Sequence, residues 1–425
     1  MLDNAEKIEK EKKGRSTLWI VSELYYPEMT STGYYLTRIA EGLANEFDVK
    51  VICGQPNYSS RGIVAPKRET HNNVEILRAA GTTLDKNVII FRVINMFTLG
   101  FSVFFKALRH FRKGDKVVVV TTPPSMPFIT AIASLTRGAE HILLIHDNYP
   151  EILVAAGKAR DSSFIVSVMG FLNRWLYKHA AKIIVVGRDM KELVGKKTAG
   201  LDIPIEIIPN WAELETVSPA PRKDNELLDE LGLGDKFVLL YAGNMGHPND
   251  LETIVEAAAG LRDNPAPHFI FLGAGAKKPW LESEISSRGI NNISILSPRP
   301  RSEQKVFLNG CDVALVSLVG KMWGVSMPSR TYNILAAGKP ILALTEPGSE
   351  VDRVITDDDV GWSVTPGDVN GFVAAVENAM KDPVRLREMG TRARSAALGR
   401  YSVDIAVESY RNALNGCASD NENEC

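Results

Sequence analysis

The sequence has few cysteines, and none stands in a spacing that cysteine chemistry uses. Cys53, Cys311, Cys417 and Cys425 are the four among 425 residues, and no two of them form a C-x-x-C pair. This excludes a zinc ribbon and gives no sign of a disulfide framework, so reduced thiols and a cytoplasmic location are expected. The other side chains show no metal-ligand spacing either, and we predict no metal.

The sequence also lacks an N-terminal signal and a long apolar run. Residues 1–16 are charged throughout, which excludes a secretory signal and predicts a disordered arm. The most apolar stretch, Val93–Phe105, has 13 residues without a charge, fewer than the ~18–20 that a spanning helix needs. Rich in Phe and followed by Lys106 and Arg109, it could lie in a membrane interface. The alternative is a buried helix of an α/β domain.

Two nucleotide-binding motifs are absent. No segment reads G-x-x-x-x-G-K-[ST], which disfavours a P-loop nucleotidase, and no G-x-G-x-x-G fingerprint supports an NAD enzyme. Composition is otherwise that of a globular protein, with 45% hydrophobic and 24% charged residues. Residues 1–200 carry 28 Lys and Arg against 19 Asp and Glu, whereas the whole chain has a net charge of −2. The basic first half is expected to meet something anionic.

Short apolar runs alternate with helical patterns along nearly the whole chain, and this predicts parallel, doubly wound sheets. A proline-containing stretch without apolar periodicity, residues 213–224, divides the alternation and predicts a linker. We therefore expect an α/β protein with two Rossmann-like domains. The predicted boundaries are an arm at 1–16, domains at 17–212 and 225–395, a helix returning to the first domain at 396–416 and a disordered tail at 417–425. Ligands of such sheets lie beyond the carboxyl ends of the strands.

The stretch Gly324–Pro347 is predicted to be a loop, a short helix, a turn and a buried strand, and the rest of the chain is organised around it. Ser329 is a good N-cap and Arg330 begins the helix, so a hydroxyl, a guanidinium and a helix N-terminus would come together beside a sheet. Such a site holds a phosphate; the alternative is an ordinary capped helix. Two Gly-rich turns after strands would add to a diphosphate site, Gly243-Asn244-Met245-Gly246 and Gly273-Ala274-Gly275, the latter followed by Lys277 and Lys278.

In the first domain, His146 and Asp147 follow the strand His141–His146 and would face the same cleft. Either could take or hold a proton, because His titrates near neutrality and Asp is an acceptor. The alternative is a strand-end His beside an Asp that caps the next turn. Gly33, at the start of the first helix, would let a ligand approach closely.

Residues 17–415 resemble the glycosyltransferases of family 4, which have the GT-B fold and retain anomeric configuration. The resemblance is carried by SELYYPEMTSTGYYLTRIAEGLA, HDNYPE, LLYAGNMG, FLGAGAKKPWLE and MPSRTYNILAAGKPILA. The last motif is similar to the branch that includes fucosyl- and N-acetylfucosaminyl-transferases of O-antigen and colanic acid synthesis. It implies a UDP- or GDP-sugar donor, no cofactor, no nucleic-acid partner and a lipid-linked saccharide acceptor on the inner face of the plasma membrane.

The resemblance also implies roles for individual residues. The donor diphosphate would meet Gly243, Asn244, Gly246, Lys277, Lys278, Ser329 and Arg330, with backbone near Arg299 reading the base and Asn333 the ribose. His146 and Asp147 would line the reacting centre with Arg330, and Thr32, Gly33 and Tyr149 would lie on the acceptor side.

The chain departs from the family pattern where most members have two glutamates, since Val325 and Asn333 stand there, and Asn244 stands where many have arginine. An asparagine can still bond a hydroxyl but carries no charge. Two other functions therefore stay open: a nucleotide-sugar epimerase on the same scaffold, and a catalytically degenerate subunit that only binds donor.

Overall fold

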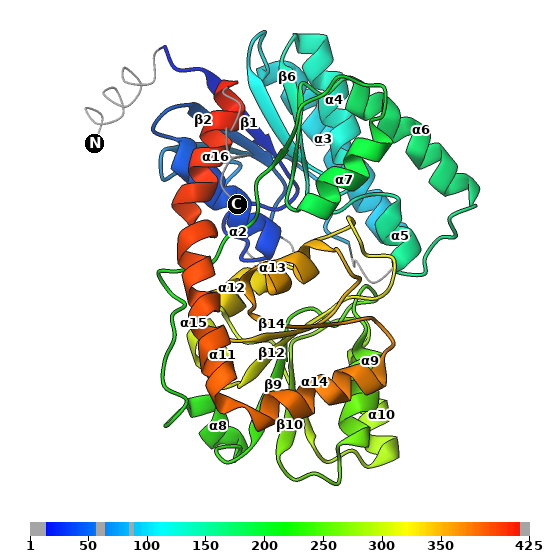
Figure 1. Cartoon of the computed structure of the whole chain (residues 1–425). Helices are drawn as coiled ribbons and strands as arrows, with labels where there is room; N and C mark the ends of the chain where they lie inside the picture. The colour runs from blue at the N-terminus through cyan, green and yellow to red at the C-terminus, as the bar shows by residue number, and fades with distance from the viewer. Residues whose placement is uncertain (1–13, 57–63, 85–88, 417–425) are drawn as a thin grey trace.

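The computed structural model describes residues 14–56, 64–84 and 89–416. Most of the predicted arm, the predicted tail and the short segments 57–63 and 85–88 lie outside these residues. Two α/β domains stand one above the other, as Figure 1 shows, and the sheets of both have helices on their two faces. The prediction of two doubly wound domains is confirmed.

The described part of the N-terminal domain holds a sheet of eight strands in the order β3-β4-β2-β1-β5-β6-β7-β8, parallel except for β3. Its strands are β1 (Thr17–Val21), β2 (Asp48–Cys53), β3 (Arg68–His71), β4 (Val74–Arg78), β5 (Lys116–Val120), β6 (Glu140–Ile145), β7 (Lys182–Val185) and β8 (Ile205–Ile207). Its helices are α2 (Ser31–Leu43), α3 (Ile89–His110), α4 (Met126–Arg137), α5 (Glu151–Ala155), α6 (Phe164–Lys178) and α7 (Arg188–Lys197).

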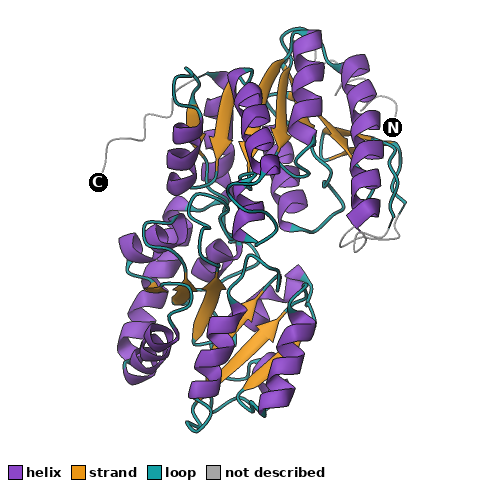
Figure 2. Cartoon of the chain, turned by 90° about the vertical axis from the view of Figure 1, so that its right-hand side faces the viewer, coloured by secondary structure: helices purple, strands orange, loops and turns teal. Residues whose placement is uncertain are grey.

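The C-terminal domain has a parallel sheet of six described strands in the order β11-β10-β9-β12-β13-β14. The strands are β9 (Phe237–Ala242), β10 (Pro267–Leu272), β11 (Ile293–Leu296), β12 (Val313–Ser317), β13 (Ile341–Leu344) and β14 (Gly361–Val364). The helices are α8 (Glu226–Leu231), α9 (Leu251–Gly260), α10 (Lys278–Arg288), the 3₁₀ turn η1 (Arg301–Glu303), α11 (Gln304–Asn309), α12 (Arg330–Ala336), α13 (Glu350–Asp358) and α14 (Val369–Lys381). Figure 2 shows this sheet between its helices.

The helix predicted to return to the first domain at 396–416 begins later, at Val403, because residues up to Arg400 belong to the preceding helix. Helix α15 (Pro383–Arg400) packs on α12 within the C-terminal domain, and α16 (Val403–Asn415) packs on α2 in the N-terminal one. The chain therefore crosses at Tyr401 and Ser402, as the red end of Figure 1 shows. The other crossing lies beside it, because the Ala212 amide donates to the Tyr401 carbonyl over 2.8 Å.

Two strands without an apolar run could not be predicted from the sequence patterns. Strand β3 has the sequence RETH, and β14 is only GWSV. Both stand at an edge of their sheet, where one side has no partner strand and little apolar surface is required. Helix α2 begins at Ser31, because the Thr30 side chain accepts from the Gly33 amide and caps it.

Ion pairs between α7 and α13 join the two domains into a seam. The Arg188 Nε lies 3.0 Å from Glu350 Oε2 and its Nη1 2.6 Å from Asp357 Oδ2, while Arg353 pairs with Glu192 at 2.7 Å. Glu350 is buried, and burial raises the pKa of its carboxyl even with Arg188 beside it. A buried carboxylate of this kind depends on its partner, so the seam holds the two domains close together.

A buried histidine is expected to make the fold sensitive to acid. His141 in β6 is 2% exposed, neither ring nitrogen has a hydrogen-bond partner among the described residues, and burial lowers its pKa to about 4. Below pH 6.5 His141 is protonated in the unfolded chain, whereas in the folded chain it stays neutral down to about pH 4. The free energy of unfolding therefore falls as pH falls through this window. In His141→Gln the loss between pH 7 and pH 5 should shrink by about 2 kcal/mol, measured by urea unfolding at both pH values. An unchanged difference would show that His141 takes up its proton in the folded protein.

Candidate active site

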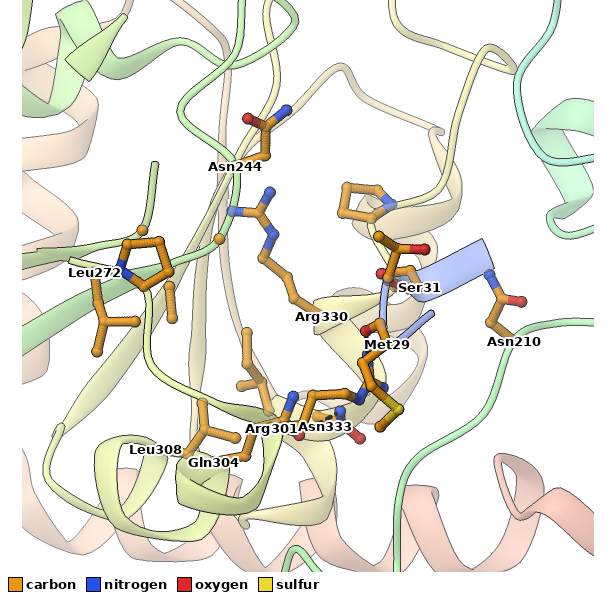
Figure 3. Close-up of a pocket in the computed structure, with 18 of the residues that line it drawn as sticks. Met29, Ser31, Asn210, Asn244, Leu272, Arg301, Gln304, Leu308, Arg330 and Asn333 are labelled. Atoms are coloured by element: carbon orange, nitrogen blue, oxygen red, sulfur yellow. Dashed lines mark hydrogen bonds between the residues drawn. The ribbon is translucent and has the colours of Figure 1, made fainter. Parts of the chain in front are cut away.

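A cavity of about 830 Å³ lies between the two domains, at the carboxyl ends of strands from both sheets. The N-terminal domain contributes the start of α2 and the end of β6, and the C-terminal domain contributes the loops after β9, β10 and β11 with the start of α12. Figure 3 shows residues of this cleft. Nine of the predicted site residues line it: Thr32, His146, Asp147, Gly243, Asn244, Arg299, Ser329, Arg330 and Asn333.

Arg330 is the cation of the C-terminal wall. Its guanidinium carbon lies 4.7 Å from the ring centre of Tyr241, and Nη1 is buried without a hydrogen-bond partner among the described residues. A Cβ on Gly243 would lie only 2.7 Å from that carbon, so the glycine gives the guanidinium its place. Figure 3 shows the side chain pointing toward Asn244 at the end of β9. A planar cation with an unused buried donor is suited to a phosphate group.

Ser329 does not cap α12, although the sequence predicted that it would. Its backbone is already helical and its side chain makes no capping bond, and the hydroxyl lies 3.1 Å from the Ser31 hydroxyl of the opposite domain. The helix is also only seven residues long. The anion-binding character of this corner therefore depends on the Arg330 side chain, while Ser329 marks where the two walls meet.

His146 and Asp147 form the opposite wall at the end of β6. The Nε2 of His146 is buried without a partner among the described residues, and burial lowers the pKa of the ring to about 4. Burial raises the pKa of Asp147, although Ser326 and Thr122 hydrogen-bond its carboxylate. The expectation that His146 titrates near neutrality is thus wrong. At pH 7 it is a neutral imidazole, able to bond a sugar hydroxyl but not to serve as a ready acid.

Asn333 is held in a network that the sequence did not suggest. Its Nδ2 donates to Glu213 Oε1 and Gln304 Oε1, both over 2.8 Å, and its Oδ1 accepts from the Glu213 amide. Arg301 pairs with the same Glu213 and stacks 4.2 Å from the ring centre of Tyr34. Both amide hydrogens of Asn333 are therefore engaged, so it could meet a ribose only as an acceptor.

Restoring the family's glutamate at this position is expected to harm the protein. In Asn333→Glu a second carboxylate would stand beside Glu213 in a place where Asn333 is only 5% exposed. Like charges at this distance repel, and two donors are lost, so the free energy of unfolding should fall by about 2 kcal/mol. The double variant Asn333→Glu, Glu213→Gln should recover most of the loss in urea unfolding, because the new amide can donate. An Asn333→Glu variant as stable as the parent would contradict this account.

Val325 is a core residue joined to the opposite domain through its backbone. It is 2% exposed, and its carbonyl accepts from the Asn148 amide over 2.8 Å. The Asn148 Nδ2 donates to the Gly324 carbonyl, and the Gly324 amide donates to the Asp189 carboxylate. The backbone of the loop before α12 is therefore fixed to the N-terminal domain by hydrogen bonds from or to Asn148 and Asp189. An apolar side chain suits a position covered in this way.

The other five predicted site residues do not line the cleft. Lys277 donates to Glu252 over 2.7 Å and Lys278 lies 3.9 Å from Glu282, so both amines are paired within their own domain. Gly33 lies in the first turn of α2, where a Cβ would stand 2.7 Å from the Glu28 carbonyl oxygen. Position 33 is therefore a glycine because the Glu28 carbonyl leaves no room for a side chain. The remaining two are Gly246 and Tyr149, the latter beside a smaller adjoining cavity.

Several polar residues of the cleft were missed by the sequence reasoning, among them Asn210, Arg301 and Gln304. Arg301 and Gln304 follow β11 at the start of a helical turn, in the same setting as Arg299. Arg299 lines the cleft too, with its guanidinium paired to Glu230 and Glu303. The rule that sites collect after parallel strands could have drawn attention to all of these positions.

Two family models match the chain. The "Glycosyl transferase 4-like domain" matches residues 31–211, and "Glycosyl transferases group 1" matches residues 224–396. Among curated relatives, WbjE of Pseudomonas aeruginosa, named as a probable glycosyltransferase, is 29% identical over 92% of this chain and 96% of its own. WcaI of Escherichia coli (strain K12), named for colanic acid biosynthesis, is 26% identical over 84% of this chain and 91% of its own.

Solved structures share the fold over the full length. Sucrose-phosphate synthase from Thermosynechococcus elongatus superposes with a TM-score of 0.76 at 15% identity, covering 95% of this chain and 100% of that one. HepE of Anabaena in complex with UDP-glucose has a TM-score of 0.70 at 14% identity, covering 94% and 99%. The chain is therefore a glycosyltransferase of the GT-B fold, in which a glycosyl transferase 4-like domain is followed by a domain of the glycosyl transferases group 1.

Proposed function

We propose that this glycosyltransferase moves a hexose or hexosamine from a nucleotide diphosphate to a lipid-linked saccharide, with retention of anomeric configuration, during synthesis of a surface polysaccharide. The observation that carries the proposal is the guanidinium of Arg330, which faces the cleft and whose buried Nη1 has no hydrogen-bond partner in the described part of the chain. An anionic donor with a diphosphate would satisfy it. Fucose and N-acetylfucosamine are the first sugars to test, and UDP and GDP the first nucleotides.

The donor side of the proposal draws on the C-terminal wall and on the relatives. Loops after β9, β10 and β11 line the same cavity with Arg299 and Gln304, and we propose that the base and ribose of the donor bind on this side. The neighbour HepE is a complex with UDP-glucose, and WcaI is named for colanic acid biosynthesis. These two names suggest the donor class and the product class.

The chemistry needs little beyond positioning and charge. The bond between the anomeric carbon and the diphosphate oxygen breaks, and its electron pair leaves with the nucleotide. The acceptor hydroxyl forms the new bond on the same face, and its proton passes to the departing phosphate. Arg330 stabilises the negative charge that grows on the diphosphate, a role that we propose requires no metal ion.

The acceptor side of the proposal rests on the N-terminal wall. His146 is neutral at pH 7, and Asp147 and Thr32 stand beside it in the cavity. Neutral and acceptor groups of this kind suit the hydroxyls of a saccharide. Because a lipid-linked acceptor stays in the bilayer, we propose that the enzyme works as a peripheral protein on the cytoplasmic face of the plasma membrane.

The test is nucleotide release from a panel of UDP- and GDP-sugars, with and without membrane extract that contains lipid-linked saccharides. Acceptor-dependent release from one donor, with a product of retained configuration by NMR, is the expected result. Conversion of the donor without any acceptor would instead indicate an epimerase. Donor binding without release from any sugar of the panel would indicate a binding subunit.

A further inference from the structure

The apolar surface of the described chain is concentrated on three helices. Thirteen of the nineteen large hydrophobic side chains that are exposed lie on α3, α4 and α6, and these include every exposed phenylalanine. On these three helices the most exposed side chains are Phe164 at 84%, Phe171 at 76%, Phe101 at 69% and Phe97 at 68%. Scattered exposed residues are normal, but a concentration of this size marks an interaction surface.

The three helices lie side by side on the N-terminal domain. Helix α3 packs along α4, and α4 contacts α6, and Figure 1 places the three labels together on one side of the upper sheet. On α3 the outward side chains Ile90, Ile94, Phe97, Phe101 and Phe105 recur every three or four residues. They therefore form one stripe along the helix.

The opposite side of α3 is the part that folds into the domain. Leu99, Val103 and Ala107 on that side are buried in the core. Among the described residues, α3 is the one helix long and apolar enough to cross a bilayer, with 28% of its most apolar window buried. The sequence left a buried helix and an interfacial one open, and α3 has both a core side and an exposed apolar side.

Charge on these helices has one sign. They contain Arg92, Lys106, Arg109, Arg137, Arg174 and Lys178 and no aspartate or glutamate. An apolar face with cationic residues around it is complementary to a bilayer that contains anionic lipid, since rings enter the acyl boundary while cations meet the headgroups. A second copy of the same face would instead place cations against cations.

We propose that α3, α4 and α6 form a docking face that lies on an anionic bilayer, with Phe97, Phe101 and Phe171 inserted among the lipids. The proposal deepens the proposed function, because it names the surface from which a lipid-linked acceptor would be taken. Each of these helices connects the carboxyl end of one parallel strand to the next strand, so each begins at the sheet edge that forms the cleft. The face therefore extends from the rim of the active site.

The test is co-sedimentation of the full chain with vesicles of phosphatidylcholine alone or mixed with phosphatidylglycerol. The unmodified protein should bind the mixed vesicles more tightly, and less so as salt increases. Phe101→Asp and Phe171→Asp should each weaken binding about tenfold or more, because an inserted ring becomes a charge. Leu398→Asp on α15, with 51% exposure on the other domain, is the matched control and should bind as the parent does.

Three further measurements make the result decisive. Thermal unfolding of each variant would show that its fold is intact, and UDP and GDP binding in solution should be equal in all of them. No vesicle binding by the parent, equal losses in Leu398→Asp and Phe101→Asp, or a dimer in light scattering that Phe101→Asp dissociates would overturn the docking face. Vesicle binding by a protein that transfers no sugar would refute the proposed function alone.

Discussion

Replacing Arg330 by alanine is expected to slow sugar transfer by about 10²- to 10³-fold, because the leaving diphosphate loses the cation aimed at it. The side chain lies in the cleft, and its Nη1 has no protein partner in the described structure, so little folding energy depends on it. Rates of nucleotide release at saturating donor and acceptor would measure the effect, with circular dichroism as a check of the fold. Turnover like that of the parent would remove Arg330 from the mechanism.

Lys277→Ala provides the matched control. Sequence patterns placed Lys277 at the diphosphate, whereas the structure pairs its amine with Glu252 outside the cleft. Its removal should change turnover less than about threefold, as expected for a partly exposed pair. Arg330→Lys should fall between the parent and Arg330→Ala, since it keeps the charge but loses the planar pair of donors.

Gly243→Ala should lower the rate of sugar transfer by about tenfold to a hundredfold, although it removes no polar side chain from the cleft. The new methyl would lie 2.7 Å from the guanidinium carbon of Arg330, and the glycine has a φ of +150°, which side chains rarely adopt. The guanidinium must move by at least some tenths of an ångström, and misplacement on this scale is costly in catalysis. Steady-state rates of nucleotide release would measure the loss.

A double-mutant cycle would show whether the two changes act through one group. If Gly243→Ala acts by displacing Arg330, it should cost little in the Arg330→Ala background, so the two effects would be far from additive. Additive losses would mean that Gly243 contributes to the reaction by another route, such as its own amide.

The fold was predictable because its evidence is repeated along the chain. Apolar runs such as Ile341–Leu344 became strands buried on both faces, as their composition predicted. The edge strands β3 and β14 carry too little apolar sequence to be found in this way. The break at Tyr401 and Ser402 depends on which domain each helix packs against, which no local pattern contains.

The site was predictable only in position. Strand ends identified Arg330 and His146 as cleft residues, because parallel sheets place their ligands there, and the resemblance to family 4 added Asn333. Their partners come from distant parts of the chain. The bond from Asn333 to Glu213 spans 120 residues, and the burial that lowers the pKa of His146 exists only in the folded chain. Titration and pairing therefore needed the folded structure.

The return of α16 to the N-terminal domain has a consequence for biosynthesis. Val407, Tyr410 and Leu414 complete the same core as Leu36 and Ile39 of α2, yet the ribosome makes them after the entire C-terminal domain. The first domain to emerge is thus the last to be finished, and its open flank must stay shielded through most of translation. The domain begun second can complete its core first, which reverses the usual order of folding on the ribosome.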